Sequence, residues 1–233
     1  YLRGGPVKYA WYDSDQIAIV SVRGGDERVL NPDYDQYVYS PRWSRDGKAL
    51  YFRVEDDRIT SLASMAITGG EPEILYPTRS EPGVARSFEV GAKGIAALVE
   101  FPQRPAEIYR VKDGAALTDH NREFRDSIEW GSVDAFDATS ADGVAVGSML
   151  RKPPGFRKGK KYPTIFYIHG GPVGQDAFDF DFTAQLLAAQ GYLVVQPNYR
   201  GSAGRGEAFR SLNVRNLGLG DYEDVISGVD ALI

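Results

Sequence analysis

The stretch "TIFYIHGGPVGQ", residues 164 to 175, ends an apolar, partly β-branched run at a histidine and continues into Gly-Gly-Pro. A near-continuous apolar strand is typical of a sheet that helices cover on both faces. Ligands of such sheets gather at the carboxyl ends of the strands, where His169, Gly170 and Gly171 lie. Glycine lets the backbone approach a substrate closely, and a free N–H there can point at a developing oxyanion. We therefore expect this loop to belong to a functional site.

The sequence after this loop predicts helix, strand and helix. A helix is expected at roughly 180 to 190, ending before Gly191, and "YLVVQPN" (192 to 198) predicts a second buried strand. A further helix is expected over 221 to 233, with Asp221 as its cap. Apolar side chains at helical spacing are expected to face the core; they are Phe182, Leu186 and Ala189 in the first helix and Tyr222, Val225, Ile226, Val229 and Leu232 in the second. Strand, helix, strand, helix predicts a parallel, covered sheet.

The residues up to about 125 have a different rhythm, with short alternating runs separated by turn residues. The phrase "GGDERVL" (24 to 30) returns as "GGEPEIL" (69 to 75), 45 residues later, and a weaker copy lies in 94 to 118. A repeat of 40 to 50 residues with several strands is typical of propeller blades. Trp43 is expected to pack between two blades. A β-sandwich is the alternative, and three blades at most cannot close a ring.

The fold class expected is therefore multidomain, β followed by α/β: a partial β-propeller and then a parallel sheet covered by helices. The change of rhythm falls near Asp126, so we expect two domains, 1–125 and 126–233. The second begins with a hairpin over 132 to 153 that turns at Asp142-Gly143.

Two longer stretches carry a family resemblance. "KKYPTIFYIHGGPVGQ" followed by "AAQGYLVVQPNYRGSAGRGEAF" resembles the start of the catalytic domain of the prolyl oligopeptidase family, nearest to its acylaminoacyl-peptidase and dipeptidyl-peptidase branches. The resemblance is tight over about 133 to 233 and loose over 1 to 125. It implies a propeller in front of an α/β-hydrolase domain, and hydrolysis of short peptides through a serine acyl-enzyme, with the propeller filtering substrates by size.

The resemblance also implies roles for single residues. Gly170 matches the position whose backbone N–H helps to form the oxyanion hole in the acylaminoacyl-peptidase branch. His169 stands where the dipeptidyl-peptidase branch has a tyrosine, and we expect it to orient the loop with Gly171 rather than to act as a general base. The "NYRGS" segment matches a loop beside the active site, where Asn198, Tyr199 and Arg200 are expected to form the substrate loop, Asn198 and Arg200 mainly bracing it.

The catalytic triad is not found in these 233 residues. No serine lies in a G-x-S-x-G motif, and Ser202 and Ser227 both lack that context. The chain has two histidines, of which His120 is expected to be an exposed linker residue and His169 belongs to the glycine motif. Because α/β-hydrolases order the triad as Ser, Asp or Glu, His, we expect all three after Ile233. The chain by itself is then expected to be inactive.

Composition excludes several other functions. The chain has no cysteine, and its net charge of −5 does not favour a nucleic-acid partner. No apolar run reaches the roughly 20 residues of a membrane helix, so no membrane partner is expected. The acids at 176, 179 and 181 are expected to favour the N-terminus of the following helix, so we expect no metal site and no cofactor.

Two other functions remain open from the sequence: an esterase with the same sheet, and a non-catalytic propeller protein with a degenerate hydrolase domain. The sequence predicts a soluble protein, and shows no signal peptide, although the N-terminus is expected to be missing. The compartment, whether cytoplasmic or periplasmic and secreted, stays open. Peptide specificity and oligomeric state also stay open.

Overall fold

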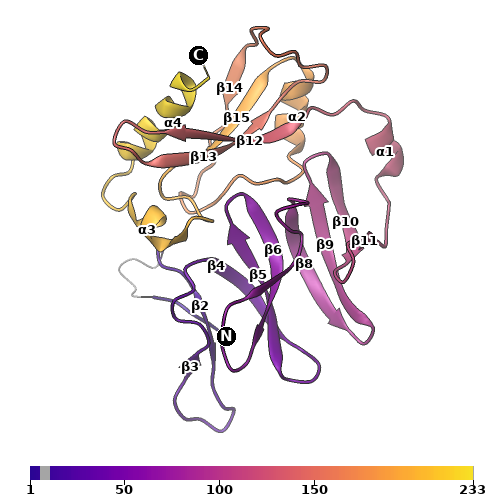
Figure 1. Ribbon diagram of the computed structural model, residues 1–233, viewed down its shortest axis with the longest axis vertical. Helices are drawn as coiled ribbons and strands as arrows, with labels where there is room; N and C mark the ends of the chain where they lie inside the picture. Colours follow the sequence, from indigo (N-terminus) through magenta and orange to yellow (C-terminus); the bar gives the residue numbers. More distant parts are fainter. Residues whose placement is uncertain (6–10, 233) are drawn as a thin grey trace.

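The computed structural model describes residues 1–5 and 11–232, and consists of β-sheets followed by an α/β region (Figure 1). The first region contains eleven strands in the described residues. They are β1 (Leu2–Arg3), β2 (Gln16–Ile19), β3 (Arg28–Val29), β4 (Tyr37–Trp43), β5 (Ala49–Asp56), β6 (Ile59–Ala66), β7 (Glu73–Tyr76), β8 (Val84–Gly91), β9 (Gly94–Phe101), β10 (Arg104–Arg110) and β11 (Ala115–Ala116).

These strands form successive antiparallel meanders. β4 to β7 pair in chain order, and so do β8 to β11; the two groups are joined by a single parallel bridge between Thr60 and Val84. β1, β2 and β3 form a separate three-stranded sheet. The expected hairpins are confirmed, including the Gly-Gly tips, because Gly24, Gly25, Gly69 and Gly70 all have positive φ. A closed propeller is not formed by the described residues.

Side chains of neighbouring meanders bury one another. Period-2 alternation places Leu50, Phe52 and Val54 of β5 on one face. They pack with Ile17 of β2 and with Leu30, which follows β3. A second cluster joins the β4–β7 meander to the β8–β11 meander; it contains Leu62, Tyr76, Ala85, Phe88, Ala97, Val99, Phe101, Tyr109 and Val111. Trp43 is not between the sheets: it is 53% exposed, so that expectation is wrong.

The second region is a four-stranded sheet with helices. Its elements are α1 (Arg122–Asp126), β12 (Val133–Thr139), β13 (Ala145–Arg151), β14 (Thr164–Phe166), α2 (Phe182–Ala189), β15 (Leu193–Asn198), α3 (Gly206–Ser211) and α4 (Gly220–Asp230). The strand order is β12-β13-β15-β14, and only β14 and β15 are parallel. The expected hairpin at Asp142-Gly143 and the buried strand β15 are confirmed.

The strand before the glycines is shorter and less buried than its sequence predicts. β14 has three residues, and Tyr167 and Ile168 after it are 43% and 51% exposed. The reason is its place at the edge of the sheet, where one of its sides has no neighbouring strand in the described part of the chain.

The expected buried face is wrong for α2, and for α4 it is wrong at Tyr222 and confirmed in part at the half-buried residues Val225, Ile226, Val229 and Leu232. In α2, Phe182 and Leu186 are more than half exposed, while Ala184, Gln185 and Ala188 are buried. In α4, Tyr222 is 59% exposed, and the buried residues are Asp224, Ser227 and Gly228. α2 therefore approaches the sheet through small and polar side chains. Leu219 rather than Asp221 precedes the first turn of α4. No described helix is long and apolar enough to cross a membrane.

Candidate active site

The glycine loop, residues 169–178, leaves the carboxyl end of β14. Gly170 is exposed, and its N–H donates to no acceptor among the described residues. A Cβ placed on Gly170 would meet nothing within 4 Å. The Gly170 amide is therefore free to donate a hydrogen bond to a ligand, as an oxyanion-hole donor must.

A second loop, residues 199–205, follows β15 and is called the arginine loop here. The two loops are tied together through Asn198, whose Oδ1 accepts from Asp176 N at 2.7 Å and whose Nδ2 donates to Asp176 O at 2.8 Å. Tyr199 adds a third bond, because its hydroxyl donates to His169 O at 2.8 Å. Both side chains are thus turned toward the glycine loop.

His169 is held on three sides. Its ring stacks on Tyr199 with the centroids 4.7 Å apart, and its Nδ1 donates to Gly170 O at 3.1 Å. Since a carbonyl can only accept, Nδ1 carries the proton, and Nε2 accepts from the Ser202 hydroxyl at 3.0 Å. Burial lowers the pKa of His169 below its usual 6.5, so the ring is neutral at pH 7.

The Ser202–His169 pair has the hydrogen bond of a catalytic Ser–His dyad but a different setting. Ser202 is fully buried, so its hydroxyl cannot reach a substrate. The bond instead fixes the ring of His169 between the two loops. No local sequence pattern predicts this contact, because the two residues are 33 positions apart.

Arg200 belongs to the arginine loop, but its side chain is buried. Its backbone N, Nε and Nη2 donate to the carboxylate of Asp224 at 2.7, 2.9 and 2.6 Å. Nη1 donates to Asp142 at 2.7 Å. Hydrogen bonds to Asp224 and then to Asp142 raise the pKa of Arg200, so it is permanently charged. Arg200 is 4% exposed, which places it as a brace between α4 and the β12–β13 turn.

The three acids at the end of the glycine loop differ in their contacts. Asp181 is the N-cap of α2, because it accepts from Ala184 N at 2.9 Å. Asp179 pairs with Arg151 and Arg86. Asp176 accepts from Gln196, but its second oxygen is buried and unpartnered in the described residues. Only one acid therefore makes the expected cap bond. Within residues 1–5 and 11–232, no three acids or histidines converge to hold a metal.

Asp176 is expected to make stability depend on pH. Burial first, and then the charges of Asp179 and Asp181, raise its pKa from 3.8 to about 7. Between these values the folded chain binds one more proton than the unfolded chain. The stabilisation from Asp176 is therefore fully present below about pH 4 and is lost as pH rises to 7. Over this range the free energy of unfolding falls by up to about 1.4 kcal/mol per pH unit. Asp176→Asn should be more stable than wild type at pH 8 and not at pH 4, by urea unfolding.

Asp26→Asn is the control for this measurement, because Asp26 lies exposed in the loop between β2 and β3. Its unfolding free energy should follow that of wild type at every pH. An Asp176→Asn variant whose advantage is the same at pH 4 and pH 8 would show that the buried charge is not the cause.

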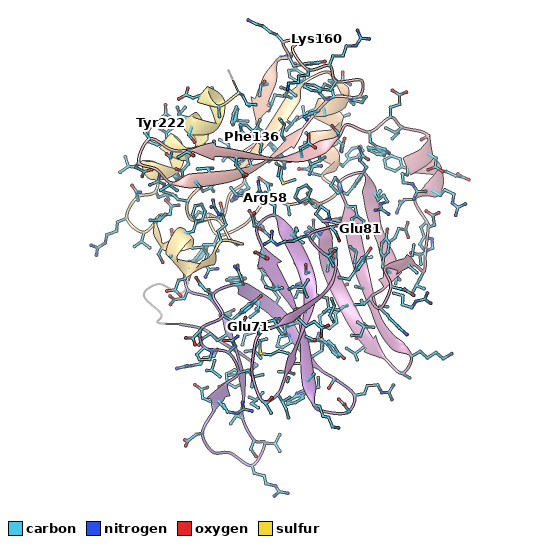
Figure 2. The ribbon with its side chains drawn as sticks, in the orientation of Figure 1. Arg58, Glu71, Glu81, Phe136, Lys160 and Tyr222 are labelled. Atoms are coloured by element: carbon cyan, nitrogen blue, oxygen red, sulfur yellow. The ribbon has the colours of Figure 1, made fainter. Side chains whose placement is uncertain are left out.

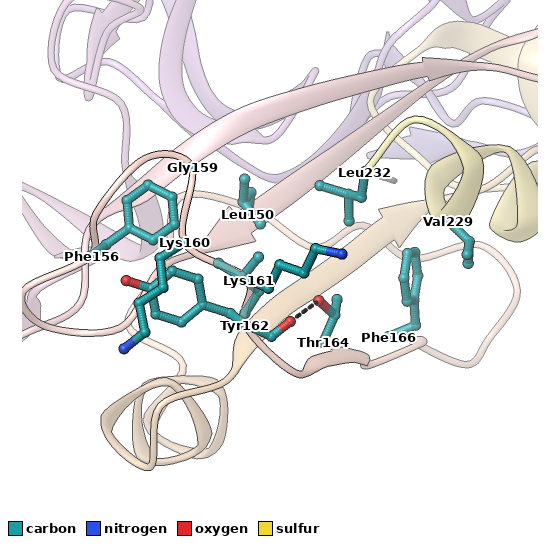
Figure 3. A pocket seen from close by; sticks show the side chains of 11 residues that line it. Leu150, Phe156, Gly159, Lys160, Lys161, Tyr162, Thr164, Phe166, Val229 and Leu232 are labelled. Atoms are coloured by element: carbon teal, nitrogen blue, oxygen red, sulfur yellow. Dashed lines mark hydrogen bonds between the residues drawn. The ribbon is translucent and has the colours of Figure 1, made fainter.

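A cavity of about 580 Å³ lies at the opposite end of the sheet (Figure 3). Thr164 and Leu193, at the amino ends of β14 and β15, line it together with Phe166, Val229 and Leu232. Figure 3 shows the Phe156 and Tyr162 rings side by side at its rim. Functional loops of α/β sheets lie at the carboxyl ends, so this cavity is separate from the glycine loop.

Comparison with known proteins shows that the chain is similar to peptidases. The prolyl oligopeptidase family profile matches residues 178–233. An uncharacterised peptidase of Bacillus subtilis, YuxL, is 32% identical over 83% of this chain and 30% of its own length. Dipeptidyl-peptidase 5 of Porphyromonas gingivalis is 28% identical over 95% of this chain and 33% of its own length. The chain thus spans about a third of the curated relatives it matches.

Solved structures of the same kind share the fold. An acylaminoacyl peptidase of Pyrococcus horikoshii superposes with a TM-score of 0.81 at 27% identity, over 95% of this chain and 34% of that one. An acylaminoacyl peptidase in complex with Z-Gly-Gly-Phe-chloromethyl ketone gives 0.84 at 26% identity, over 98% and 35%. Both the β region and the α/β region are therefore similar to these enzymes.

Proposed function

Because this chain belongs to the prolyl oligopeptidase family, we propose that it forms part of a serine-type peptidase that hydrolyses short peptides through an acyl-enzyme. The observation that carries the proposal is the free, exposed Gly170 amide at the carboxyl end of β14, beside a second loop fixed to it by Asn198 and Tyr199. Acyl transfer needs such a donor, because negative charge on the carbonyl oxygen develops only as the tetrahedral intermediate forms.

The domain arrangement belongs to the same proposal. Residues 1–125 would be the last blades of a β-propeller, supported by two antiparallel meanders of four strands that bury a common apolar face. Residues 126–233 would be the first part of the α/β-hydrolase domain. The described sheet contributes Gly170 as oxyanion donor, with His169 and Gly171 shaping the loop and Asn198, Tyr199 and Arg200 holding the loop beside it.

The nucleophile must come from elsewhere in the full-length protein. These 233 residues hold no G-x-S-x-G motif, and Ser202, the serine bonded to a histidine, is buried. The serine, acid and histidine of the triad would follow Ile233 in the sequence. Short peptides are the proposed substrates, in keeping with the Z-Gly-Gly-Phe group bound by the related acylaminoacyl peptidase.

The test is to label the full-length protein with a fluorophosphonate and to assay peptide anilides against simple esters. We expect one labelled serine and hydrolysis of the anilides, both lost when that serine is replaced by alanine. The 233-residue chain alone should be neither labelled nor active. Hydrolysis of esters without anilides would favour an esterase, and a full-length protein that is not labelled would favour a non-catalytic binding protein.

A further inference from the structure

The tip of the β5–β6 hairpin lies between the β region and the α/β region. Asp56 pairs with Ile59, so Asp57 and Arg58 alone form the turn. Figure 2 shows Arg58 at the junction of the two regions. Its side chain enters the α/β region, where Nη1 donates to Asp137 at 2.7 Å and to Ser148 O at 3.2 Å.

The backbone of this tip is in an unfavourable conformation. Asp57 and Arg58 have φ of 38° and 70°, the pattern of a type I′ turn, in which Asn-Gly or Asp-Gly is the usual pair. A bulky residue at positive φ costs conformational energy and persists where its surroundings fix it, often near functional sites. Arg58 is 7% exposed, so the surroundings that fix it are those of the α/β region.

The glycine loop is hydrogen-bonded to the tip through Gln175 and Phe178. Gln175 Oε1 accepts from Arg58 N at 3.0 Å, and Gln175 Nε2 donates to Ile59 O at 3.2 Å. Phe178 N donates to Arg58 O at 2.9 Å. These three hydrogen bonds pair the backbone N–H of Arg58 and the carbonyls of Arg58 and Ile59. The tip therefore fixes the position of the end of the glycine loop.

The arginine loop is held by the same tip. Asp57 N donates to Gly204 O at 2.7 Å, and the neighbouring Ala203 N donates to Gly174 O of the glycine loop at 2.9 Å. A Cβ on Gly204 would come within 2.3 Å of Gln175 Oε1 and 3.0 Å of Asp57 N. The hairpin tip, the glycine loop and the arginine loop thus pack together so closely that no side chain fits at Gly204.

The glycine loop has little backbone bonding of its own. Among the described residues, its one internal backbone bond runs from Gly174 N to Pro172 O. The loop therefore depends on outside partners for its shape. From this geometry we propose that the Asp57-Arg58 tip, through Gln175, is a positioning element that holds the Gly170 amide in place for the chemistry. The catalytic role of this positioning rests on the proposed function. The positioning itself can be measured without any activity.

The first test is amide hydrogen exchange in the 233-residue chain with Gln175→Met, which keeps the side-chain size and removes both hydrogen bonds. The informative amides are those of Asp176 and Ala203, which bond to Asn198 and Gly174 and not to Gln175. If the tip holds the loops, both should exchange about tenfold faster or more. Faster exchange at Arg58 alone, which loses its own partner, would overturn the proposal.

Asp35→Ala is the matched control. Asp35 Oδ1 accepts from Glu207 N at 2.7 Å, so it joins the same two regions without touching the glycine loop. Exchange at Asp176 and Ala203 should stay as in wild type. An equal increase in this variant would mean that general docking of the regions matters, not the tip. Gln175→Asn, too short to reach both partners, provides a second variant should Gln175→Met not fold.

The second test is kinetic and uses the full-length protein. Gln175→Met should lower kcat about 10- to 100-fold with KM nearly unchanged, because a misplaced donor costs the transition state and not the bound substrate. Asp35→Ala should keep the wild-type kcat. A Gln175→Met variant with wild-type kcat would contradict the inference. If full-length wild type hydrolyses nothing, the proposed function is wrong, and the exchange result still decides the role of the tip.

Discussion

Gly170→Pro is expected to lower kcat of the full-length peptidase by roughly 10²- to 10³-fold, because proline has no N–H to donate to the oxyanion. The Gly170 amide is exposed and makes no bond to the described residues, so its loss removes no contact of the resting loop. KM should change little, since the interaction forms only in the transition state. Steady-state kinetics on a peptide anilide measure both constants.

Gly170→Ala is the control for this substitution. Gly170 is not among the glycines with positive φ, and an added Cβ would meet nothing within 4 Å, so alanine fits the loop and keeps the N–H. Its kcat should remain within a few fold of wild type. Proline and alanine variants with equal kcat would show that the Gly170 amide is not an oxyanion donor.

Asp224→Ala is expected to lower the free energy of unfolding by about 3–5 kcal/mol. Asp224 is fully buried and accepts three hydrogen bonds from Arg200, which is itself buried. Removing the acid leaves the buried Arg200 with only the half-exposed Asp142 as counter-ion and removes the acceptor of its backbone N, Nε and Nη2. The desolvation penalty of the under-paired cation is the source of the loss. Urea unfolding of the chain measures the change.

Asp142→Ala tests the other partner of Arg200. The Asp142 side chain is 53% exposed, so water replaces it, and a loss below about 1 kcal/mol is expected. The decisive result is that Asp224→Ala loses more unfolding free energy than Asp142→Ala. Equal losses at Asp142 and Asp224 would mean that the buried pair is no more costly to break than the exposed one.

Local sequence predicted most of the elements. Gly-Gly phrases and alternating runs identified the hairpins of the β region, and Asp142-Gly143 identified the turn between β12 and β13. Gly191 ends α2 with φ of 94°, as expected for a C′ residue. These features are set within a few residues of the chain, since glycine and alternation act locally.

The buried face of α2 and part of that of α4 could not be predicted in the same way. Periodicity selected Phe182 and Leu186 of α2 and Tyr222 of α4 as core residues, yet all three are more than half exposed. Ala184 and Ala188 are buried against the sheet instead, and Asp224 is buried by its pairing with Arg200. Apolar spacing does not reveal a buried ion pair, because the partner is 24 residues away.

The sequence by itself determined the order of β and α/β regions, the glycines after β14 and the absence of a G-x-S-x-G motif, because each is a property of neighbouring residues. Only the tertiary structure decided that Ser202 bonds His169, that Arg200 pairs with Asp224, and that Gln175 grips the hairpin at Arg58. The last of these joins residues 117 positions apart. Such contacts depend on how two separately patterned regions pack, and no local pattern encodes that packing.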